Sequence, residues 1–347
     1  MAYTTISKHT DYFNTKLYTG NSGTLNVTGV GHQPDFVWIK DMSSSGDDYA
    51  MYDVVRGVNK RIRSNQNDAE NTESAALTSF DSDGFTVGTA GSSNGNGDSF
   101  VSWNWKTSGS QGSSNTDGSI NTTYTSVNTT AGFSISKYVG TGSAATVGHG
   151  LGVVPKMLMI KDLSAATDWT IYNVGVGNTK RLVLNTTGAQ EDDASFFNDT
   201  TPTSSVFSIG SSSAVNLSGR NYICYAFTDI VGYSKFGSYL GNGNADGPFI
   251  YTGFKPAFVM TKKSSGTGAW AMMDNKRPGY NVTKNYLQAN DSTTEHVDVS
   301  FNLDLLSNGW KARHNNGDFN SSGQTYIYMA FAETPLVGSN GVTAKAR

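Results

Sequence analysis

The sequence has little of the chemistry on which enzymes and nucleic-acid-binding proteins depend. Its single cysteine, Cys224, excludes an intrachain disulfide framework. Charged residues make up only 15% of the chain, the formal net charge is −3, and no basic block is present. A groove that follows phosphates is therefore not expected. No apolar run is long enough to span a membrane, and residues 1–14 show no signal-peptide pattern. We expect neither a nucleic-acid partner nor membrane insertion.

Sustained helical periodicity is missing as well. The chain has 39 glycines, and Ser, Thr and Asn fill its polar positions, a composition that favours many short strands joined by turns. The best helix candidate, residues 69–77, allows one short helix or turn at most. The sequence therefore predicts an all-β fold of antiparallel sheets packed face to face, with jelly-roll or Greek-key connections.

One motif is present three times. Gly-x-x-Pro leads into an apolar, strand-like run that ends on a lysine, at Gly31–Lys40, Gly152–Lys161 and Gly253–Lys262. Proline at the start of a strand removes no ladder hydrogen bond. Each copy is preceded by an aromatic strand with a Tyr-x-Gly turn (Tyr18, Tyr138, Tyr239) and closed by another aromatic strand (100–105, 222–227, 326–331). The near-constant spacing of these landmarks predicts three copies of one unit.

Each copy has the size of a domain, roughly 100 residues, rather than that of a solenoid repeat. We therefore predict three tandem antiparallel β-sandwiches, called repeats 1, 2 and 3 below, at residues 1–107, 131–232 and 233–335. The Ser/Thr/Asn/Gly run 108–130 predicts a flexible linker. Residues 336–347 are expected to form a tail that lies on the surface or docks on a partner.

The closing strands indicate which side chains face the core. Period-two alternation separates one set that is apolar in every copy (101, 103 and 105; 223, 225 and 227; 327, 329 and 331) from a set of varying polarity. The first set is predicted to point inward, and the second outward or against a second layer. Cys224 belongs to the second set and is expected to be an inert, packed thiol.

Two repeated positions are candidates for contact with a ligand or partner. Tyr49, Trp169 and Trp270 occupy one equivalent position after the Pro-led strand. Core packing is the default for such aromatic residues, and a sugar-stacking platform or a protein contact is the alternative. Lys40, Lys161 and Lys262 end the Pro-led strands. They are either solvated strand ends or a repeated contact with an anionic glycan or partner.

A catalytic or metal centre is not expected. Acid–base chemistry needs paired carboxylates in a shaped pocket, but the carboxylates of repeat 1 have no counterpart constellation in repeat 2. The five histidines lack metal-ligand spacing. Residues 81–84 and 94–98 resemble calcium loops but lack further oxygen ligands, so turns are predicted and a weak calcium site in repeat 1 stays open. We expect no catalytic residue, no metal and no cofactor.

Several stretches resemble a repeated domain of unassigned function, found in tail-fibre-labelled structural proteins of marine and cyanobacterial tailed phages. They include the N-terminal Met-Ala-Tyr-Thr-Thr-Ile and residues 18–21, 31–40, 56–57, 79–85, 148–155, 232–239 and 326–333. The resemblance covers nearly the whole chain. It implies a virion component with a lectin-like or SPRY-like sandwich fold, and it supplies no catalytic residue.

These observations lead to one expected function and two alternatives. We expect a non-enzymatic, tail-associated fibre or adhesin, exposed on the virion as a homo-oligomer, that contacts host surface glycan or other virion proteins. The first alternative is a capsid or tail decoration (cement) protein, because the sequence has neither the heptads nor the Gly-x-y triplets of a fibre shaft. The second alternative, a glycan depolymerase, is disfavoured because the carboxylates of repeat 1 have no counterpart constellation in repeat 2.

Overall fold

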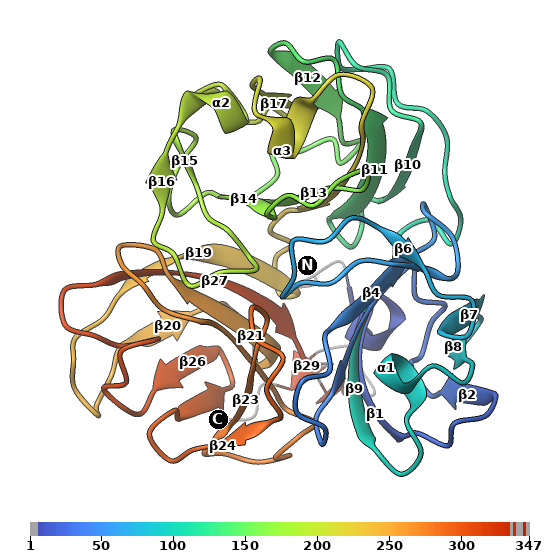
Figure 1. The fold of residues 1–347 in the computed structure, drawn as a ribbon. Helices are drawn as coiled ribbons and strands as arrows, with labels where there is room; N and C mark the ends of the chain where they lie inside the picture. Colours follow the sequence, from blue (N-terminus) through green and yellow to red (C-terminus); the bar gives the residue numbers. More distant parts are fainter. Residues whose placement is uncertain (1–5, 334–335, 338–342, 345–347) are drawn as a thin grey trace.

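Three antiparallel sheets surround one centre in the computed structural model, which describes residues 6–333, 336–337 and 343–344 (Figure 1). The described chain is predominantly β. Its few helical segments are short: η1 (His9–Asp11), α1 (Gly91–Asn94), α2 (Ala194–Phe197) and α3 (Ser213–Asn216). The structure thus supports the predicted all-β class with several antiparallel sheets. Residues 69–77 hold a strand and turns rather than a helix.

The three central sheets share one strand order: the opening strand, the closing strand, the Pro-led strand and the strand that follows it. In repeat 1 these are β1 (Phe13–Thr19), β9 (Ser99–Trp105), β3 (Phe36–Asp41) and β4 (Ala50–Asp53). In repeat 2 they are β11 (Phe133–Val139), β18 (Asn221–Phe227), β13 (Met157–Asp162) and β14 (Thr170–Asn173), with β10 (Tyr124–Asn128) added outside β11. In repeat 3 they are β19 (Ser234–Leu240), β27 (Thr325–Ala332), β21 (Pro256–Lys263) and β22 (Trp270–Asp274), extended by β23 (Asn285–Gln288) and β24 (His296–Val297).

A smaller outer sheet covers the far face of each central sheet. The outer sheets are β2 (Leu25–Thr28), β8 (Gly84–Val87) and β7 (Leu77–Asp81); β12 (Ala145–Gly148) and β17 (Val206–Ile209); and β20 (Phe249–Tyr251), β26 (Gly309–Ala312) and β25 (Leu303–Leu306). Short two-stranded pairs complete the fold: β5 (Lys60–Arg61) with β6 (Asn71–Thr72), β15 (Lys180–Arg181) with β16 (Glu191–Asp192), and β28 (Leu336–Val337) with β29 (Thr343–Ala344).

The largest hydrophobic core lies between the three central sheets and is common to all of them. Aromatic rings meet there across repeats: Phe36 stacks on Tyr225 with centroids 4.5 Å apart, and Phe13 stacks on Phe331 at 5.0 Å. The apolar set of every closing strand belongs to this core, which confirms the prediction that it points inward. Most of the opposite set packs in three separate cores under the outer sheets. Each central sheet is therefore buried on both faces.

This arrangement differs from separate sandwiches joined by a flexible linker. The segment 108–130 contains β10, which pairs with β11, and it forms two further bridges, Ser113 to Thr125 and Ile120 to Val147. Its polar composition does not prevent strand formation, because the hydroxyls pair with one another, as Ser126 Oγ does with Thr107 Oγ1 at 2.6 Å. The expected tail, 336–347, is described only in β28 and β29, which pair together.

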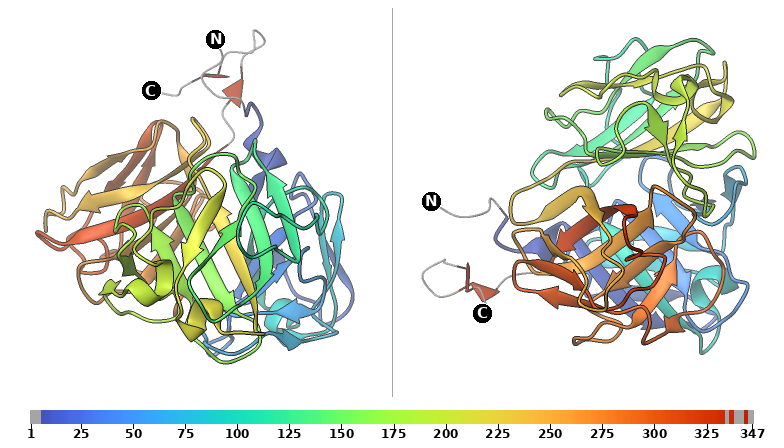
Figure 2. Two further views of the ribbon diagram at one scale, coloured as in Figure 1. Left: turned by 90° about the horizontal axis from the view of Figure 1, so that it is seen from above. Right: turned by 90° about the vertical axis from the view of Figure 1, so that its left-hand side faces the viewer.

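The described ends of the main body lie on one face. The ring nitrogen Nδ1 of His9, just before β1, is 2.8 Å from the carbonyl oxygen of Glu333, just after β27. Figure 2 shows β28 and β29 standing out from the body on this face, which is turned away from the viewer in Figure 1. The face seen in Figure 1 carries the loops that follow the Pro-led strands.

Candidate functional site

The six candidate contact residues all lie in the interior. Lys40, Lys161 and Lys262 are 0% exposed, and the three aromatic residues at the other repeated position, Tyr49, Trp169 and Trp270, are at most 1% exposed. The hypothesis that these side chains contact a glycan or partner at the surface is therefore corrected. Core packing, the default for the aromatic residues, describes their location. The alternative that the lysines are solvated strand ends is wrong, because all three are buried.

Each buried lysine holds a loop of the neighbouring repeat. These loops are called arms 1, 2 and 3 below and comprise residues 62–70, 182–190 and 287–295. The Nζ atoms of Lys161, Lys262 and Lys40 donate to the carbonyl oxygens of Asn67 in arm 1 (3.1 Å), Thr187 in arm 2 (3.0 Å) and Ser292 in arm 3 (3.2 Å). The same atoms also donate within their own repeats, to the carbonyl oxygens of Thr167 (2.9 Å), Gly268 (2.8 Å) and Asp47 (2.9 Å).

Burial shifts the pKa of these lysines. Loss of hydration lowers the pKa of Lys161 and of Lys262 to about 8, and it lowers the pKa of Lys40 below its ordinary value. The carboxylate of Asp162 opposes this effect at Lys161, and that of Asp41 does so at Lys40. The ammonium groups are thus held mainly by backbone carbonyls at a desolvation cost, which identifies them as structural donors.

The aromatic residues fasten the same arms. Trp169 Nε1 donates to the carbonyl oxygen of Arg63 in arm 1, and Trp270 Nε1 donates to that of Val183 in arm 2, each at 2.8 Å. Tyr49, the equivalent residue of repeat 1, cannot make this bond, and its buried hydroxyl has no hydrogen-bond partner among the described residues. Repeat 1 is therefore joined to arm 3 by one side-chain bond fewer.

Backbone hydrogen bonds show that the three repeats close into a ring. The N–H groups of Glu70, Gln190 and Glu295 donate to the carbonyl oxygens of Leu163 (3.1 Å), Ser264 (2.8 Å) and Met42 (3.0 Å). Arm 1 thus contacts repeat 2, arm 2 contacts repeat 3, and arm 3 returns to repeat 1. The last contact joins the two ends of the series without a covalent connection.

Three asparagines that shape the arms were not predicted from the sequence. Asn65, Asn185 and Asn290 accept, through Oδ1, the backbone N–H of the aromatic residue at the equivalent position of their own repeat, at 3.1, 2.9 and 2.7 Å. Each asparagine stands five residues before Glu70, Gln190 or Glu295. This constant spacing was a usable signal, but short polar residues are so common in the chain that it did not stand out.

Two buried carboxylates are the strongest candidates for acid–base chemistry, and both are fully engaged. Asp53 accepts from the backbone N–H groups of Val55 and Arg56, from Arg56 Nε, and from the hydroxyl of Tyr225 in repeat 2 at 2.7 Å. In repeat 3, Asp274 likewise binds Arg277 Nε at 2.8 Å and accepts from Trp103 Nε1 of repeat 1 at 3.2 Å. Both aspartate side chains are 0% exposed. They therefore hold pairs of repeats together.

The candidate metal and thiol residues also have structural surroundings. No group of three or more His, Cys, Asp or Glu side chains could hold a metal ion within the described part of the chain. Asp83, in the calcium-loop look-alike, accepts from the N–H groups of Gly31 (2.6 Å) and Gly29 (3.0 Å), and these bonds lower its pKa. Burial raises the pKa of the Cys224 thiol.

None of the described helices has the length and apolar character needed to cross a membrane.

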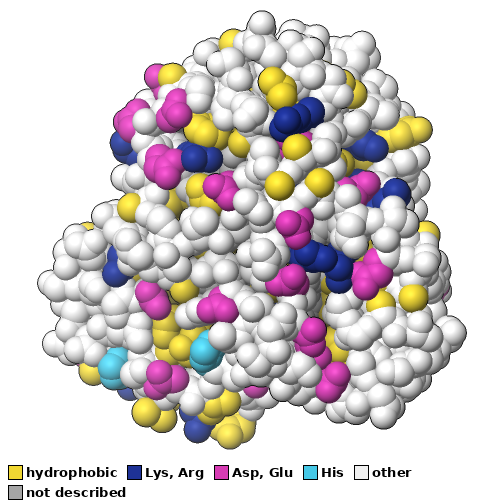
Figure 3. All heavy atoms as spheres, viewed as in Figure 1, with side chains coloured by type: hydrophobic (Ala, Val, Ile, Leu, Met, Phe, Trp, Pro, Cys, Tyr) yellow, Lys and Arg dark blue, Asp and Glu magenta, His cyan; other side chains and the backbone are white. Residues whose placement is uncertain are grey.

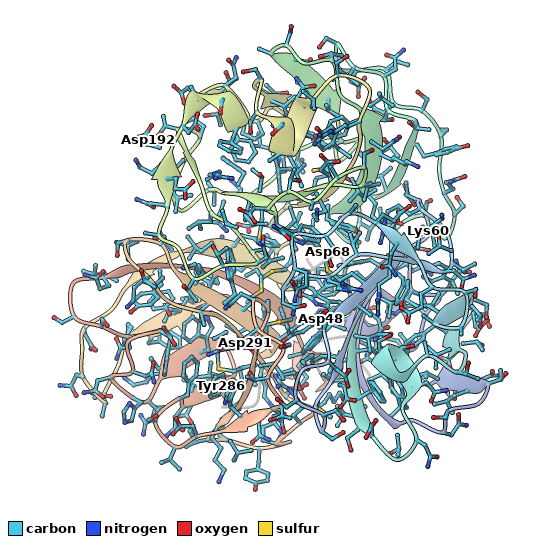
Figure 4. The ribbon with its side chains drawn as sticks, viewed as in Figure 1. Asp48, Lys60, Asp68, Asp192, Tyr286 and Asp291 are labelled. Carbon is cyan, nitrogen blue, oxygen red and sulfur yellow. The ribbon has the colours of Figure 1, made fainter. Side chains whose placement is uncertain are left out.

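Charged side chains gather on the exposed face where the three repeats meet (Figure 3). Asp48, Asp68 and Asp291 lie near this centre in Figure 4. Arg63 bridges the first two, with Nε 3.6 Å from Asp48 and Nη1 paired with Asp68. Arg63 also supplies the carbonyl that Trp169 binds, so these ion pairs within repeat 1 hold the residue of arm 1 that contacts repeat 2.

The sequence comparisons agree with an architecture that spans nearly the whole chain. A comparison with curated proteins found no match. One family model, described as a domain of unknown function (DUF7483), matches residues 8–335 and so includes every central and outer sheet. A single family unit therefore extends over all three repeats and their shared core, and the chain belongs to the DUF7483 family.

Proposed function

We propose that the protein is a non-enzymatic structural subunit of a tailed-phage virion, an adhesin associated with the tail that contacts the host surface. The observation that carries this proposal is the meeting of His9 and Glu333 at one face of the body, 2.8 Å apart. A subunit attached to the virion through that face presents its opposite face, which carries the loops that follow the three Pro-led strands, to the host surface.

The internal organisation supports the proposal. An exposed virion subunit must persist outside the cell, and this chain has no disulfide to help it, because its one cysteine is buried and free. Its stability comes from a core common to three sheets and from three arms, each of which binds the next repeat. The charged and aromatic residues that recur in the repeats serve this closure, which leaves recognition to side chains that differ between the repeats.

The resemblance to the repeated phage domain supports placement on a virion. The experiment is immunogold labelling of phage particles that carry the protein, together with competition of phage adsorption by the purified chain. We expect label at the tail and slower adsorption. Label spread over the capsid lattice would favour the decoration protein instead, and particles without label would rule out both.

The enzymatic alternative has its own test. Host envelope glycan is incubated with the purified protein, and the release of reducing ends is measured. We expect none above buffer, because Asp53 and Asp274, the candidate acid–base carboxylates, are buried and paired with arginines. Release that depends on the protein would replace the adhesin by a depolymerase.

A further inference from the structure

The outer sheet of repeat 3 carries two aromatic side chains that the core does not use. Phe249 and Tyr251 alternate along β20 with the buried Ile250, and they remain 45% and 60% exposed. Strand β20 is an edge strand that pairs with β26 (Figure 1). Side chains two apart on a strand point to the same side and lie about 7 Å apart, so the two rings form one surface.

The other repeats show that the fold does not require these rings. Ile250 pairs with Trp310 as Val27 pairs with Phe85 and as Val147 pairs with Phe207, so these three residues occupy one position. Their outward-facing neighbours are Phe249 and Tyr251 in repeat 3, Asn26 and Thr28 in repeat 1, and Thr146 and Gly148 in repeat 2. Repeat 3 therefore has two large rings where the others have small or polar residues. An exposed aromatic pair outside the hydrophobic core is typical of recognition surfaces.

The structure also holds one of the rings in place. A Cβ atom added to Gly309 would lie 3.0 Å from both Cε2 and Cζ of Phe249. The ring therefore lies across β26 and packs on the backbone that the glycine leaves uncovered. Fixing a side chain before binding reduces the entropy that binding must offset.

Charged groups of both signs lie beside Phe249 on the outer sheet. Lys311 lies opposite Phe249 in the pairing of β20 with β26, and Asp304 lies opposite Lys311 in the pairing of β25 with β26. Lys311 Nζ is 2.8 Å from Asp246, and Arg313 Nε is 3.3 Å from Asp304. The two cations are thus matched by two carboxylates, which does not favour an anionic polymer and supplies both donors and acceptors for hydroxyl groups.

We propose that Phe249 and Tyr251 form the stacking surface of a binding site for an uncharged glycan. The apolar C–H faces of sugar rings pack on the two aromatic rings, and Asp304, Lys311 and Arg313 bind the sugar hydroxyls. This inference rests on the proposed adhesin function, since it names the surface through which the adhesin recognises its host.

A peptide strand added to the edge of β20 is the competing occupant. Repeat 2 shows this geometry, because Ile120 bridges Val147 of β12 in parallel. Strand addition draws its affinity from main-chain hydrogen bonds, and β20 offers only the three residues Phe249–Tyr251. The next two N–H groups, of Thr252 and Gly253, already donate to Asn308. The short edge and the two rings favour recognition through side chains.

The test is affinity electrophoresis of the full chain in native gels that contain dextran, galactomannan or xyloglucan, with alginate as the acidic polysaccharide. The variant F249N/Y251T gives repeat 3 the side chains of repeat 1 at these positions, so it should fold, as circular dichroism can check. Tyr280→Asn is the matched control, since Tyr280 is 74% exposed in the loop before β23. We expect at least one neutral polysaccharide to retard the wild type, a tenfold or greater loss of affinity in the double variant, and no loss in the control.

Equal retardation of the wild type and F249N/Y251T would overturn the inference, as would retardation of the wild type by alginate alone. Binding to host cells separates this inference from the proposed function. Cell binding that is abolished by periodate treatment and by F249N/Y251T supports both. Cell binding that is unchanged in the variant, or lost only after protease treatment of the cells, overturns the glycan site and leaves the adhesin. A wild-type chain that is retarded by polysaccharide but does not bind cells keeps the site and removes the adhesin.

Discussion

Lys161 Nζ donates to the carbonyl oxygen of Asn67, which lies 94 residues earlier in the chain and in another repeat. The same bond joins Lys262 to Thr187 and Lys40 to Ser292. One residue type thus makes one contact three times, and the third contact closes the ring. Since the arms and the central core are common to all the repeats, the stability of each repeat depends on its neighbours.

The first prediction concerns this lysine. Lys161→Met removes the donor to the carbonyl oxygens of Asn67, Thr167 and Asp162, of which only the bond to Asp162 is fully buried. An unpaired buried acceptor costs about 1–3 kcal/mol, so we expect the free energy of unfolding at pH 7 to fall by about 1–3 kcal/mol in urea titrations. Lys60→Met is the control, because Lys60 Nζ donates to Thr72 at the exposed surface, and it should change stability by less than about 0.5 kcal/mol. Equal effects of the two substitutions would refute the structural role of Lys161.

The second prediction concerns pH. Burial lowers the pKa of Lys161 and of Lys262 from 10.5 to about 8. Between these values the unfolded chain binds more protons than the folded protein, so the contribution of these lysines to the free energy of unfolding rises with pH. Below about pH 8 both states are protonated and the contribution is constant.

The measurement is the difference in unfolding free energy between wild type and Lys161→Met at pH 7 and at pH 9.5. We expect this difference to be larger at pH 9.5 by about 1–2 kcal/mol. The contribution of the buried tyrosines, which titrate at higher pH, is the same in wild type and variant and therefore cancels in this difference. A difference that shrinks as pH rises would mean that the folded protein binds the charged ammonium better than water does.

Local sequence patterns predicted much of the fold. The Gly-x-x-Pro motif placed β3, β13 and β21, and period-two alternation identified the faces of the closing strands, because pleating depends only on the strand itself. The composition of residues 108–130 predicted a flexible linker, but part of this segment forms β10. Composition does not show that the hydroxyls of Ser126 and Thr107 bond to each other, because the two residues meet only in the folded chain. Closure into a ring could not be predicted, because it requires contacts between residues of different repeats.

The prediction that the six candidate residues contact a ligand at the surface was wrong for the same reason. A lysine at the end of a strand is usually solvated, and nothing within repeat 2 shows that arm 1 will cover Lys161. Burial of Trp169 was the default, but its Nε1 partner in Arg63 also belongs to another repeat. By contrast, the exposure of Phe249 and Tyr251 follows from alternation around Ile250 and could have been predicted by comparing the three copies.

The third prediction compares two equivalent aromatic residues. Trp169→Phe removes the donor to Arg63 and leaves space in the core, so we expect a loss of about 2–4 kcal/mol in unfolding free energy. Tyr49→Phe removes only a hydroxyl without a partner among the described residues, and it should be neutral or stabilising by up to about 1 kcal/mol. Thermal and urea unfolding of both variants gives the comparison. A large loss in Tyr49→Phe would show that a water molecule or another group binds this hydroxyl.

The fourth prediction uses a difference between the repeats. Asp53 in repeat 1 is buried with Arg56 and with Tyr225 of repeat 2. In repeat 2, Asn173 and Val176 stand at the positions of Asp53 and Arg56, and Met329 of repeat 3 stands at the position of Tyr225. Asp53→Asn removes the carboxylate nearest to the buried guanidinium, which keeps only the partly exposed Glu70 at 3.3 Å, and we expect a loss of about 3 kcal/mol. Asp192→Asn is the control, because the Asp192 side chain is 66% exposed in its pair with Lys180, and it should cost less than about 0.5 kcal/mol.

The reciprocal substitution separates charge pairing from a general preference for carboxylate at this position. Asn173→Asp makes repeat 2 resemble repeat 1, but it buries a charge beside Val176, where repeat 1 has Arg56. Burying an unpaired carboxylate is costly, so this variant should also lose stability, and it should regain part of the loss at low pH, where the carboxylate is protonated. Adding Val176→Arg should restore part of it at neutral pH. If Asn173→Asp alone were neutral, the pairing with arginine would not be what stabilises Asp53 in the core.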